Sequence, residues 1–179
     1  MGILSIGQTT SFATSRFRAY EFFNAWDREL LIRNEERTLM KILLAVDGSA
    51  YTKRMLGYLG GHQDLFSANA EYTAMTVVAP VPPQVTHFID KQILDTYFLD
   101  EAQKILTPIH AFAKKYQRNV TMLHRVGAAA DLIAETATSG KFDLLIMGSH
   151  GYSGVKSRLL GSVSSRVMAL CTTPTLIIR

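Results

Sequence analysis

The chain has 179 residues and a formal net charge of +4; 47% of its residues are hydrophobic and 19% are charged. This length and composition predict one soluble globular domain and exclude a largely disordered chain, which would be poorer in apolar side chains. The single cysteine excludes a disulfide framework, the scattered basic residues argue against a nucleic-acid partner, and no apolar run approaches the ~18 residues of a membrane span.

The first 39 residues are interpreted as an N-terminal extension that is partly disordered or helical. Residues 1–18 are rich in Ser and Thr, contain no acid and lack the apolar core of a secretory signal. Two readings stay open for them: a targeting or partner-binding arm, and a start assigned upstream of a true beginning at Met40. A loosely helical spacing of apolar residues predicts one helix over 20–36. The domain itself is expected at 40–179.

The domain opens with a strand, a helix and a second strand. Met40–Val46 is a short apolar run, typical of a strand buried on both faces of a parallel sheet. Ser49 can cap a helix that runs to about Leu59, where Gly60 and Gly61 stop it. Glu71–Ala79, rich in Thr and Val, predicts the second strand, which ends at a group of prolines.

A long helix and an edge strand follow. Apolar residues recur at helical intervals from Asp90 to about Tyr116, and Pro108 within this stretch predicts a kink. Val120–Val126 alternates apolar and polar residues, as expected for a strand near a sheet edge. After a turn at Gly127, Asp131–Thr138 predicts a short helix.

The last three elements complete a regular alternation. Phe142–Met147 is predicted to be a buried strand, Ser162–Leu170 a helix and Thr175–Ile178 the final strand. Parallel strands joined by single helices need right-handed crossovers, so we expect an α/β fold with a doubly wound five-stranded sheet. Ligands bind such sheets beyond the carboxyl ends of the strands, where the strand order reverses.

Two strand ends carry unusual residues. The first strand runs into Asp47-Gly48-Ser49, and the fourth runs into a glycine-rich segment from Gly148 to Gly161. Glycines let main-chain amides approach an anion, and the predicted helix start at Ser162 offers unpaired N–H groups, so phosphate binding is one interpretation. Turn and capping roles are the other. Neither the P-loop motif nor Gly-x-Gly-x-x-Gly after the first strand is present, which argues against a P-loop ATPase and a dinucleotide dehydrogenase.

Several motifs together resemble the universal stress protein family. The spacing Gly148-x2-Gly151-x9-Gly161-Ser162 resembles its nucleotide-binding signature, and MKILLAVDGS and CTTPTLIIR resemble its opening and closing strands. The resemblance covers Met40–Arg179, 140 of the 179 residues. It implies a Rossmann-like sheet of strand order 3-2-1-4-5, a homodimer formed through the last strand, and bound ATP or AMP.

The resemblance also implies a pocket. Asp47 would bond the ribose, since a carboxylate can accept two hydroxyl hydrogens. Asp47 and Ser162 could also act as helix caps, which is compatible with a bound nucleotide. The remaining implied positions are Ala45 and Val46 beside the base, Val77 against the adenine, Met147, Gly148 and Gly151 at the floor and first amides, and Gly161, Ser162, Val163 and Ser164 around the phosphates.

Some features of the pocket stay open. Members of the family often carry an arginine near this point of the glycine segment, whereas here the stretch is Val155-Lys156-Ser157-Arg158. The position of positive charge near the phosphates is therefore open, and the sequence does not decide between ATP and AMP. Magnesium could bridge phosphates through Asp47 or Ser162, although no dedicated acidic pair is present. The five histidines show no spacing typical of a zinc site. His150 in the glycine segment could approach a phosphate, and the preferred interpretation is an exposed loop residue.

We therefore expect a cytoplasmic regulatory protein of the stress response that binds an adenine nucleotide and hydrolyses it slowly or not at all, because no general base or second cation ligand is evident. Two alternatives remain. One is a slow ATP hydrolase or adenylyl-transfer enzyme, and the other is a nucleotide-free dimeric interaction module. An apolar last strand is an exposed edge unless a second chain pairs with it, which supports the dimer.

Overall fold

The computed structural model describes residues 39–63, 66, 69–86, 89–151 and 160–179. The helix predicted over 20–36 and the basic segment around Lys156 lie outside the described residues. The elements in chain order are β1 (Met40–Ala45), α2 (Ala50–Gly61), β2 (Ala70–Val78), α3 (Pro83–Thr86), α4 (Lys91–Lys115), β3 (Val120–Val126), α5 (Ala129–Ser139), β4 (Leu144–Gly148), α6 (Ser162–Leu170) and β5 (Thr175–Ile178).

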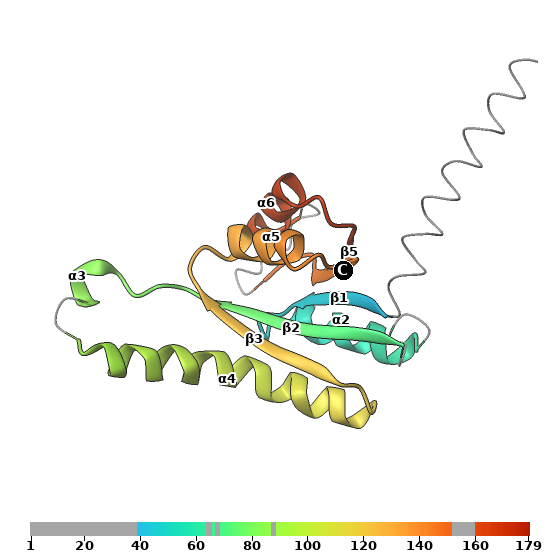
Figure 1. The fold of residues 1–179 in the computed structure, drawn as a ribbon, viewed down its shortest axis with the longest axis horizontal. Coiled ribbons are helices and arrows are strands. Elements are labelled where there is room, and N and C mark those ends of the chain that lie inside the picture. Colours follow the sequence, from blue (N-terminus) through green and yellow to red (C-terminus); the bar gives the residue numbers. More distant parts are fainter. Residues whose placement is uncertain (1–38, 64–65, 67–68, 87–88, 152–159) are drawn as a thin grey trace, which may run out of the picture. The chain divides into compact units, whose positions relative to one another are not determined.

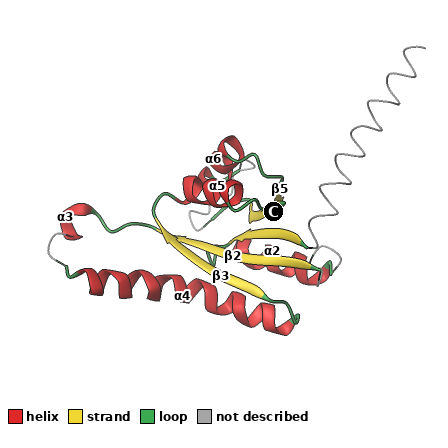
Figure 2. Ribbon diagram, viewed as in Figure 1, coloured by secondary structure: helices red, strands yellow, loops and turns green. Residues whose placement is uncertain are grey.

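The five strands form one parallel sheet in the order β3-β2-β1-β4-β5, as Figures 1 and 2 show. The predicted fold class and strand order are therefore confirmed. The order in which the chain adds strands reverses between β1 and β4, which are neighbours although four helices and two strands separate them in sequence. This is the switch point at which ligands bind in doubly wound folds.

Helices cover both faces of the sheet (Figure 2). Successive residues of β1 point to opposite faces, so Ile42 and Leu44 join the core under α2 and α4, while Leu43 and Ala45 join the core under α5 and α6. The fully buried Leu43, Leu44 and Leu145 in β1 and β4 explain why these strands read as continuous apolar runs. Burial of each such side chain contributes about 1.5–3 kcal/mol.

Most predicted boundaries agree with the structure to within two residues. Ser49 caps α2 through its hydroxyl, which accepts hydrogen bonds from the Tyr51 and Thr52 N–H groups, but Gly60 and Gly61 form the last turn of α2 instead of following it. The long helix is one continuous α4 with Pro108 inside it and Asp90 as its N-cap. The short α3 was not predicted, because the prolines before it indicated only a strand end.

None of the described helices combines the length and the apolar character that crossing a membrane requires.

Candidate functional site

A cavity lies at the carboxyl ends of β1 and β4, at the switch point of the sheet. Its volume is about 100 Å³. The wall is formed by Ala45, Val46, Asp47, Thr52, Val77, Ala129, Ile133, Met147, Gly148, His150, Gly151, Val163 and Ser164.

Nine of the eleven residues predicted for the site belong to this wall. They come from three strand ends, the glycine segment and the first turn of α6, and the fold brings them together around one cavity. They are Ala45, Val46, Asp47, Val77, Met147, Gly148, Gly151, Val163 and Ser164. The other two, Gly161 and Ser162, begin α6 as its N-cap and first residue and are not part of the wall.

Asp47 is held rigidly at the end of β1. Its Oδ1 accepts the Ser49 N–H at 2.9 Å and the Thr52 hydroxyl at 2.7 Å, and its own N–H donates to Thr52 Oγ1 at 3.0 Å. Gly48 between these residues has a φ of 80°, a conformation that glycine adopts without steric cost. Oδ2 is therefore the carboxylate oxygen that remains to accept hydrogen bonds from a ligand, and one such oxygen can accept two.

Two glycines of the segment after β4 are closely approached by neighbouring atoms. A Cβ on Gly151 would stand 2.7 Å from Asp47 Oδ2, so the free oxygen of the carboxylate lies directly against this glycine. A Cβ on Gly161 would stand 3.2 Å from His150 Cα and 3.2 Å from the Ser149 carbonyl oxygen. The Gly161 N–H donates to that same carbonyl at 2.8 Å. The two ends of the glycine segment are thereby joined beside the cavity.

The N-terminus of α6 presents main-chain donors to the cavity. The first intrahelical bond is donated by Ser165, and the N–H groups of residues 162–164 have no partner among the described residues. The Ser164 hydroxyl donates to the carbonyls of Gly148 and Ser149, at 3.0 and 3.1 Å. The Ser164 hydroxyl thus links α6 to the end of β4, and its hydrogen is already used in these bonds. The main-chain N–H groups are therefore the donors that can bind an anion.

His150 is not the exposed loop residue that the sequence suggested. It lies in the cavity wall, its ring is tilted by 35° against that of Tyr51 with centroids 5.0 Å apart, and its Nδ1 is hydrogen-bonded to the Ser149 hydroxyl at 3.0 Å. Its Nε2 is buried and has no hydrogen-bond partner among the residues that the structure describes. The ring of His150 lies against Tyr51 on α2, an element that is distant from His150 in the sequence. The residues next to His150 in the chain therefore gave no sign of this contact.

Three further wall residues were missed. Thr52 sits in the first turn of α2 and fixes Asp47, and its position three residues after the N-cap is a signal that a capping analysis could have used. Ala129 and Ile133 belong to one face of α5 and reach the cavity only because of the way α5 crosses the sheet. No motif in the sequence marks them.

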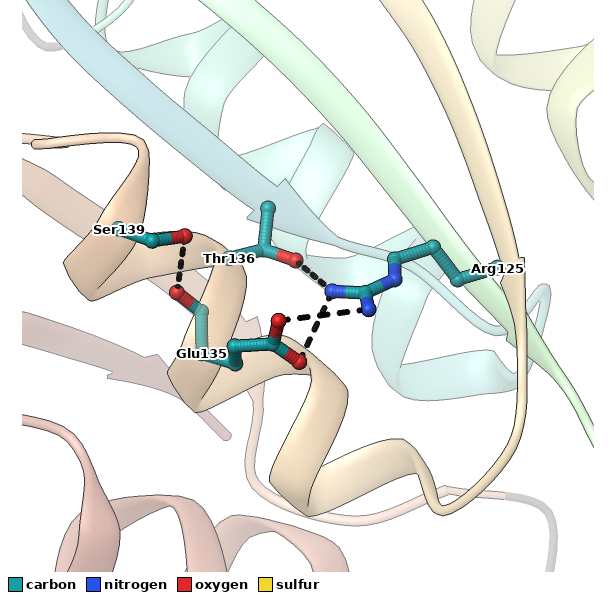
Figure 3. A network of polar contacts seen from close by, with 4 residues as sticks. All are labelled: Arg125, Glu135, Thr136 and Ser139. Atoms are coloured by element: carbon teal, nitrogen blue, oxygen red, sulfur yellow. Dashed lines mark hydrogen bonds and ion pairs between the residues drawn. The ribbon is translucent and has the colours of Figure 1, made fainter.

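Charged side chains hold α5 at two places. Figure 3 shows the Arg125 guanidinium, at the end of β3, meeting α5: Nη1 lies 3.1 Å from Thr136 Oγ1 and 3.1 Å from Glu135 Oε2. On α6, Arg166 Nε lies 3.0 Å from Asp131 Oδ1 and Nη2 lies 3.2 Å from Asp131 Oδ2. These pairs are largely exposed, so each contributes at most about 1 kcal/mol. They orient the helix that supplies Ile133 to the wall.

Within the described ranges, no group of three or more His, Cys, Asp or Glu side chains is arranged to hold a metal ion.

Comparison with known proteins identifies a single family. The model of the universal stress protein family matches residues 38–179. Universal stress protein YxiE of Bacillus subtilis is 30% identical over 150 residues, covering 78% of this chain and 98% of that protein. Universal stress protein MJ0531 of Methanocaldococcus jannaschii is 26% identical over 152 residues, covering 83% of this chain and 87% of that protein.

Solved structures of similar proteins share the fold. The hypothetical protein MJ0577 superposes with a TM-score of 0.64 at 25% identity, covering 79% of this chain and 96% of that chain. A universal stress protein in complex with cAMP gives a TM-score of 0.58 at 25% identity, covering 80% and 99%. Two family members of lower identity, from Arabidopsis thaliana with AMP and from Archaeoglobus fulgidus with dAMP, give TM-scores of 0.56 and 0.52.

Proposed function

The chain belongs to the universal stress protein family, and on that premise we propose that it binds an adenine nucleotide in the cavity between β1 and β4. The observation that carries this proposal is the convergence of two kinds of group on one cavity. Asp47 Oδ2, against Gly151, is an acceptor for sugar hydroxyls, and the first turn of α6 supplies N–H groups for a phosphate that have no partner among the described residues.

The remaining wall suits the base. Ala45, Val77, Ile133 and Met147 offer aliphatic surface, and small-molecule pockets combine such surface with a few placed polar groups. The unpartnered, buried Nε2 of His150 is a further polar atom that a ligand could satisfy, because burying such a nitrogen unpaired costs about 1–3 kcal/mol. The residues present therefore fit a nucleoside phosphate.

The choice of nucleotide follows from the relatives. The named complexes of similar proteins contain cAMP, AMP and dAMP, which share adenine, a sugar and one phosphate. We propose AMP or ATP for this chain; with ATP, Asp47 or Ser162 would be the residues to hold a Mg²⁺ ion, which would neutralise phosphate charge. The two nucleotides differ in the phosphates that extend beyond the α6 N-terminus.

Titration calorimetry with AMP and ATP tests the proposal directly. We expect saturable binding of at least one of them, and mass spectrometry of the purified protein after denaturation should detect released adenine nucleotide. GTP at the same concentration is the control for base selectivity. Absence of heat with both adenine nucleotides, together with no nucleotide retained through purification, rejects the proposal.

We propose that the nucleotide-bound protein has a regulatory role in the stress response and hydrolyses ATP slowly or not at all. Asp47 Oδ1 is occupied by Ser49 and Thr52, and the anion donors at α6 are main-chain groups that carry no proton-accepting function. The proton acceptors that remain in the wall are Asp47 Oδ2, which we assign to the ribose, and His150 Nε2, so any hydrolysis would have to use one of these two atoms. Phosphate release near the ~10 s⁻¹ median of enzymes would support the alternative of an ATP hydrolase.

We also propose a homodimer through β5, which forms one edge of the sheet next to β4. The Leu145 N–H bonds the Pro174 carbonyl and the Ser149 N–H bonds the Ile178 carbonyl, so the alternation of a parallel ladder directs the Thr175 and Ile177 main-chain groups away from β4. An unpaired apolar edge is a template for a second strand. Met168 and Leu170 on α6, each about half exposed, could extend the contact.

Replacing Thr175 with proline is expected to convert this dimer to a monomer. The outward N–H of residue 175 is lost, while proline is tolerated on an edge strand whose bond to β4 does not use that N–H. Light scattering after size exclusion at about 10 µM measures the mass, and circular dichroism checks the fold. A monomeric wild-type protein, or a Thr175→Pro variant that stays dimeric, contradicts the proposed interface.

A further inference from the structure

The wall of the cavity contains a buried side-chain nitrogen whose hydrogen-bonding capacity is unused. His150 Nε2 has no partner among the residues that the structure describes, and its burial keeps bulk water from it. The other polar side chains of the wall are engaged. Thr52 and Asp47 bond each other, and the Ser164 hydroxyl bonds two carbonyls. A buried polar atom without a partner requires an explanation, and a ligand that enters the site is one.

The Ser149 hydroxyl determines which ring nitrogen of His150 carries the hydrogen. Ser149 is 1% exposed, and the partner of its hydroxyl within the described part of the chain is His150 Nδ1, 3.0 Å away. If the hydroxyl donates to Nδ1, its hydrogen is used and the Nε2–H alone stays unpaired. If the Nδ1–H donates instead, both the buried hydroxyl hydrogen and the Nε2 lone pair stay unpaired. Buried groups without partners are costly, so the tautomer with hydrogen on Nε2 is favoured.

His150 lies between the parts of the cavity assigned to the sugar and to the phosphate. The next residue is Gly151, where a Cβ would stand 2.7 Å from Asp47 Oδ2. On the other side, a Cβ on Gly161, the N-cap of α6, would stand 3.2 Å from the His150 Cα. A nucleotide has its groups in the same order, since the first phosphate follows the ribose. The Nε2–H of His150 therefore suits a phosphate oxygen, which is a charged acceptor.

We propose that His150 is a specificity-determining residue of the nucleotide site, and that its Nε2–H donates a hydrogen bond to the first phosphate. Ser149 is the positioning residue, because its hydroxyl fixes the tautomer. The inference rests on the proposed function and adds to it a side-chain donor that favours nucleotides over the nucleoside. It also has a chemical consequence. An Nε2 that carries hydrogen is not a proton acceptor, which leaves Asp47 Oδ2 as the remaining side-chain acceptor in the wall.

Two substitutions of His150 separate the roles of its two nitrogens. The amide of Asn reaches the position of Nδ1 and can keep the bond to Ser149, but nothing takes the place of Nε2. The amide nitrogen of Gln reaches the position of Nε2 and can donate from there. We expect His150→Asn to weaken AMP binding about 10- to 100-fold, as for loss of a hydrogen bond to a charged group, and His150→Gln to stay within about fivefold of wild type.

Adenosine, which lacks the phosphate, is the matched ligand. His150→Asn should bind adenosine within about threefold of wild type, so the ratio of AMP to adenosine affinity, measured by titration calorimetry, should fall about tenfold or more. His110→Asn, which changes an exposed histidine on α4, is the control variant and should leave both affinities unchanged. Circular dichroism and thermal melting check the fold of each variant, and unchanged adenosine binding shows that the sugar and base contacts are intact.

The tautomer is tested without any nucleotide. Nitrogen NMR of the free protein at about pH 8.5 is suitable, because histidine ordinarily gains its second proton at lower pH. The spectrum should show Nε2 as the protonated ring nitrogen of His150 and Nδ1 as the unprotonated one. Ser149→Ala should raise the share of the other tautomer and weaken AMP binding about three- to tenfold, because the hydroxyl no longer donates to Nδ1.

Different results overturn different claims. If wild-type protein binds neither AMP nor ATP, the proposed function fails and this inference fails with it. If wild-type protein binds AMP and His150→Asn keeps the wild-type ratio of AMP to adenosine affinity, the phosphate contact is wrong while the proposed function stands. A His150→Gln variant that loses as much affinity as His150→Asn also overturns the contact, because the loss then reflects packing of the ring against Tyr51. A proton found on Nδ1 in the free protein contradicts the role of Ser149.

Discussion

Asp47→Asn is expected to weaken binding of an adenine nucleotide about 10- to 100-fold while leaving the protein folded. The amide oxygen can keep the position of Oδ1 and its bonds to the Ser49 N–H and the Thr52 hydroxyl. The amide nitrogen then replaces Oδ2 and cannot accept a hydroxyl hydrogen. Loss of a hydrogen bond to a charged group costs about 1.5–3 kcal/mol, and about 1.4 kcal/mol corresponds to a factor of ten in affinity.

The ribose assignment is tested by a cycle of protein and ligand changes. Wild-type protein should bind 2′,3′-dideoxy-AMP much more weakly than AMP, and Asp47→Asn should bind the two with nearly equal affinity, because the missing hydroxyls no longer have an acceptor. Asp47→Ala is the structural control, since it leaves the Ser49 N–H unpaired and should lower the free energy of unfolding by about 1–3 kcal/mol. An Asp47→Asn variant that still discriminates the two ligands as strongly as wild type would falsify the ribose contact.

The elements that local chemistry determines were predicted from the sequence. The run Met40–Val46, the cap at Ser49 and the bounds of α6 and β5 all depend on neighbours a few residues away, and they agree with the structure. The short α3 was missed because Pro83 reads as a strand end, whereas proline is also favoured in the first turn of a helix.

The parts of the site that depend on packing between distant elements could not be predicted. Tyr51 on α2 covers His150 after β4, and α5 brings Ile133 to the cavity through its crossing of the sheet. The occupation of Asp47 Oδ1 follows from the geometry of the first turn of α2, which a motif of residue types does not specify. Motif spacing thus located the cavity, while the available donors and acceptors had to be read from the structure.

Gly151→Ala is expected to weaken nucleotide binding by about 10- to 100-fold. The variant keeps every side chain of the site, and we expect it to act by displacing the Asp47 carboxylate. The new Cβ would stand 2.7 Å from Asp47 Oδ2, a separation that requires one of the two groups to move. Asp47 cannot rotate freely, because turning its carboxylate breaks the bonds that Oδ1 accepts from Ser49 and Thr52. Either the carboxylate leaves the position that faces a ligand, or the glycine segment moves away from β1.

A matched glycine elsewhere separates this effect from the general consequences of adding a methyl group. Gly57 lies inside α2 with nothing within 4 Å of a Cβ, so Gly57→Ala should bind nucleotide like wild type and raise the free energy of unfolding by about 0.5–1 kcal/mol. Calorimetric affinities and urea unfolding of the two variants provide the comparison. In the double variant Gly151→Ala/Asp47→Asn the second change should add little, because both act on the same oxygen. Additive losses of affinity would instead mean that Gly151 contributes to nucleotide binding independently of Asp47. In that case the added methyl group would not act by displacing the Asp47 carboxylate.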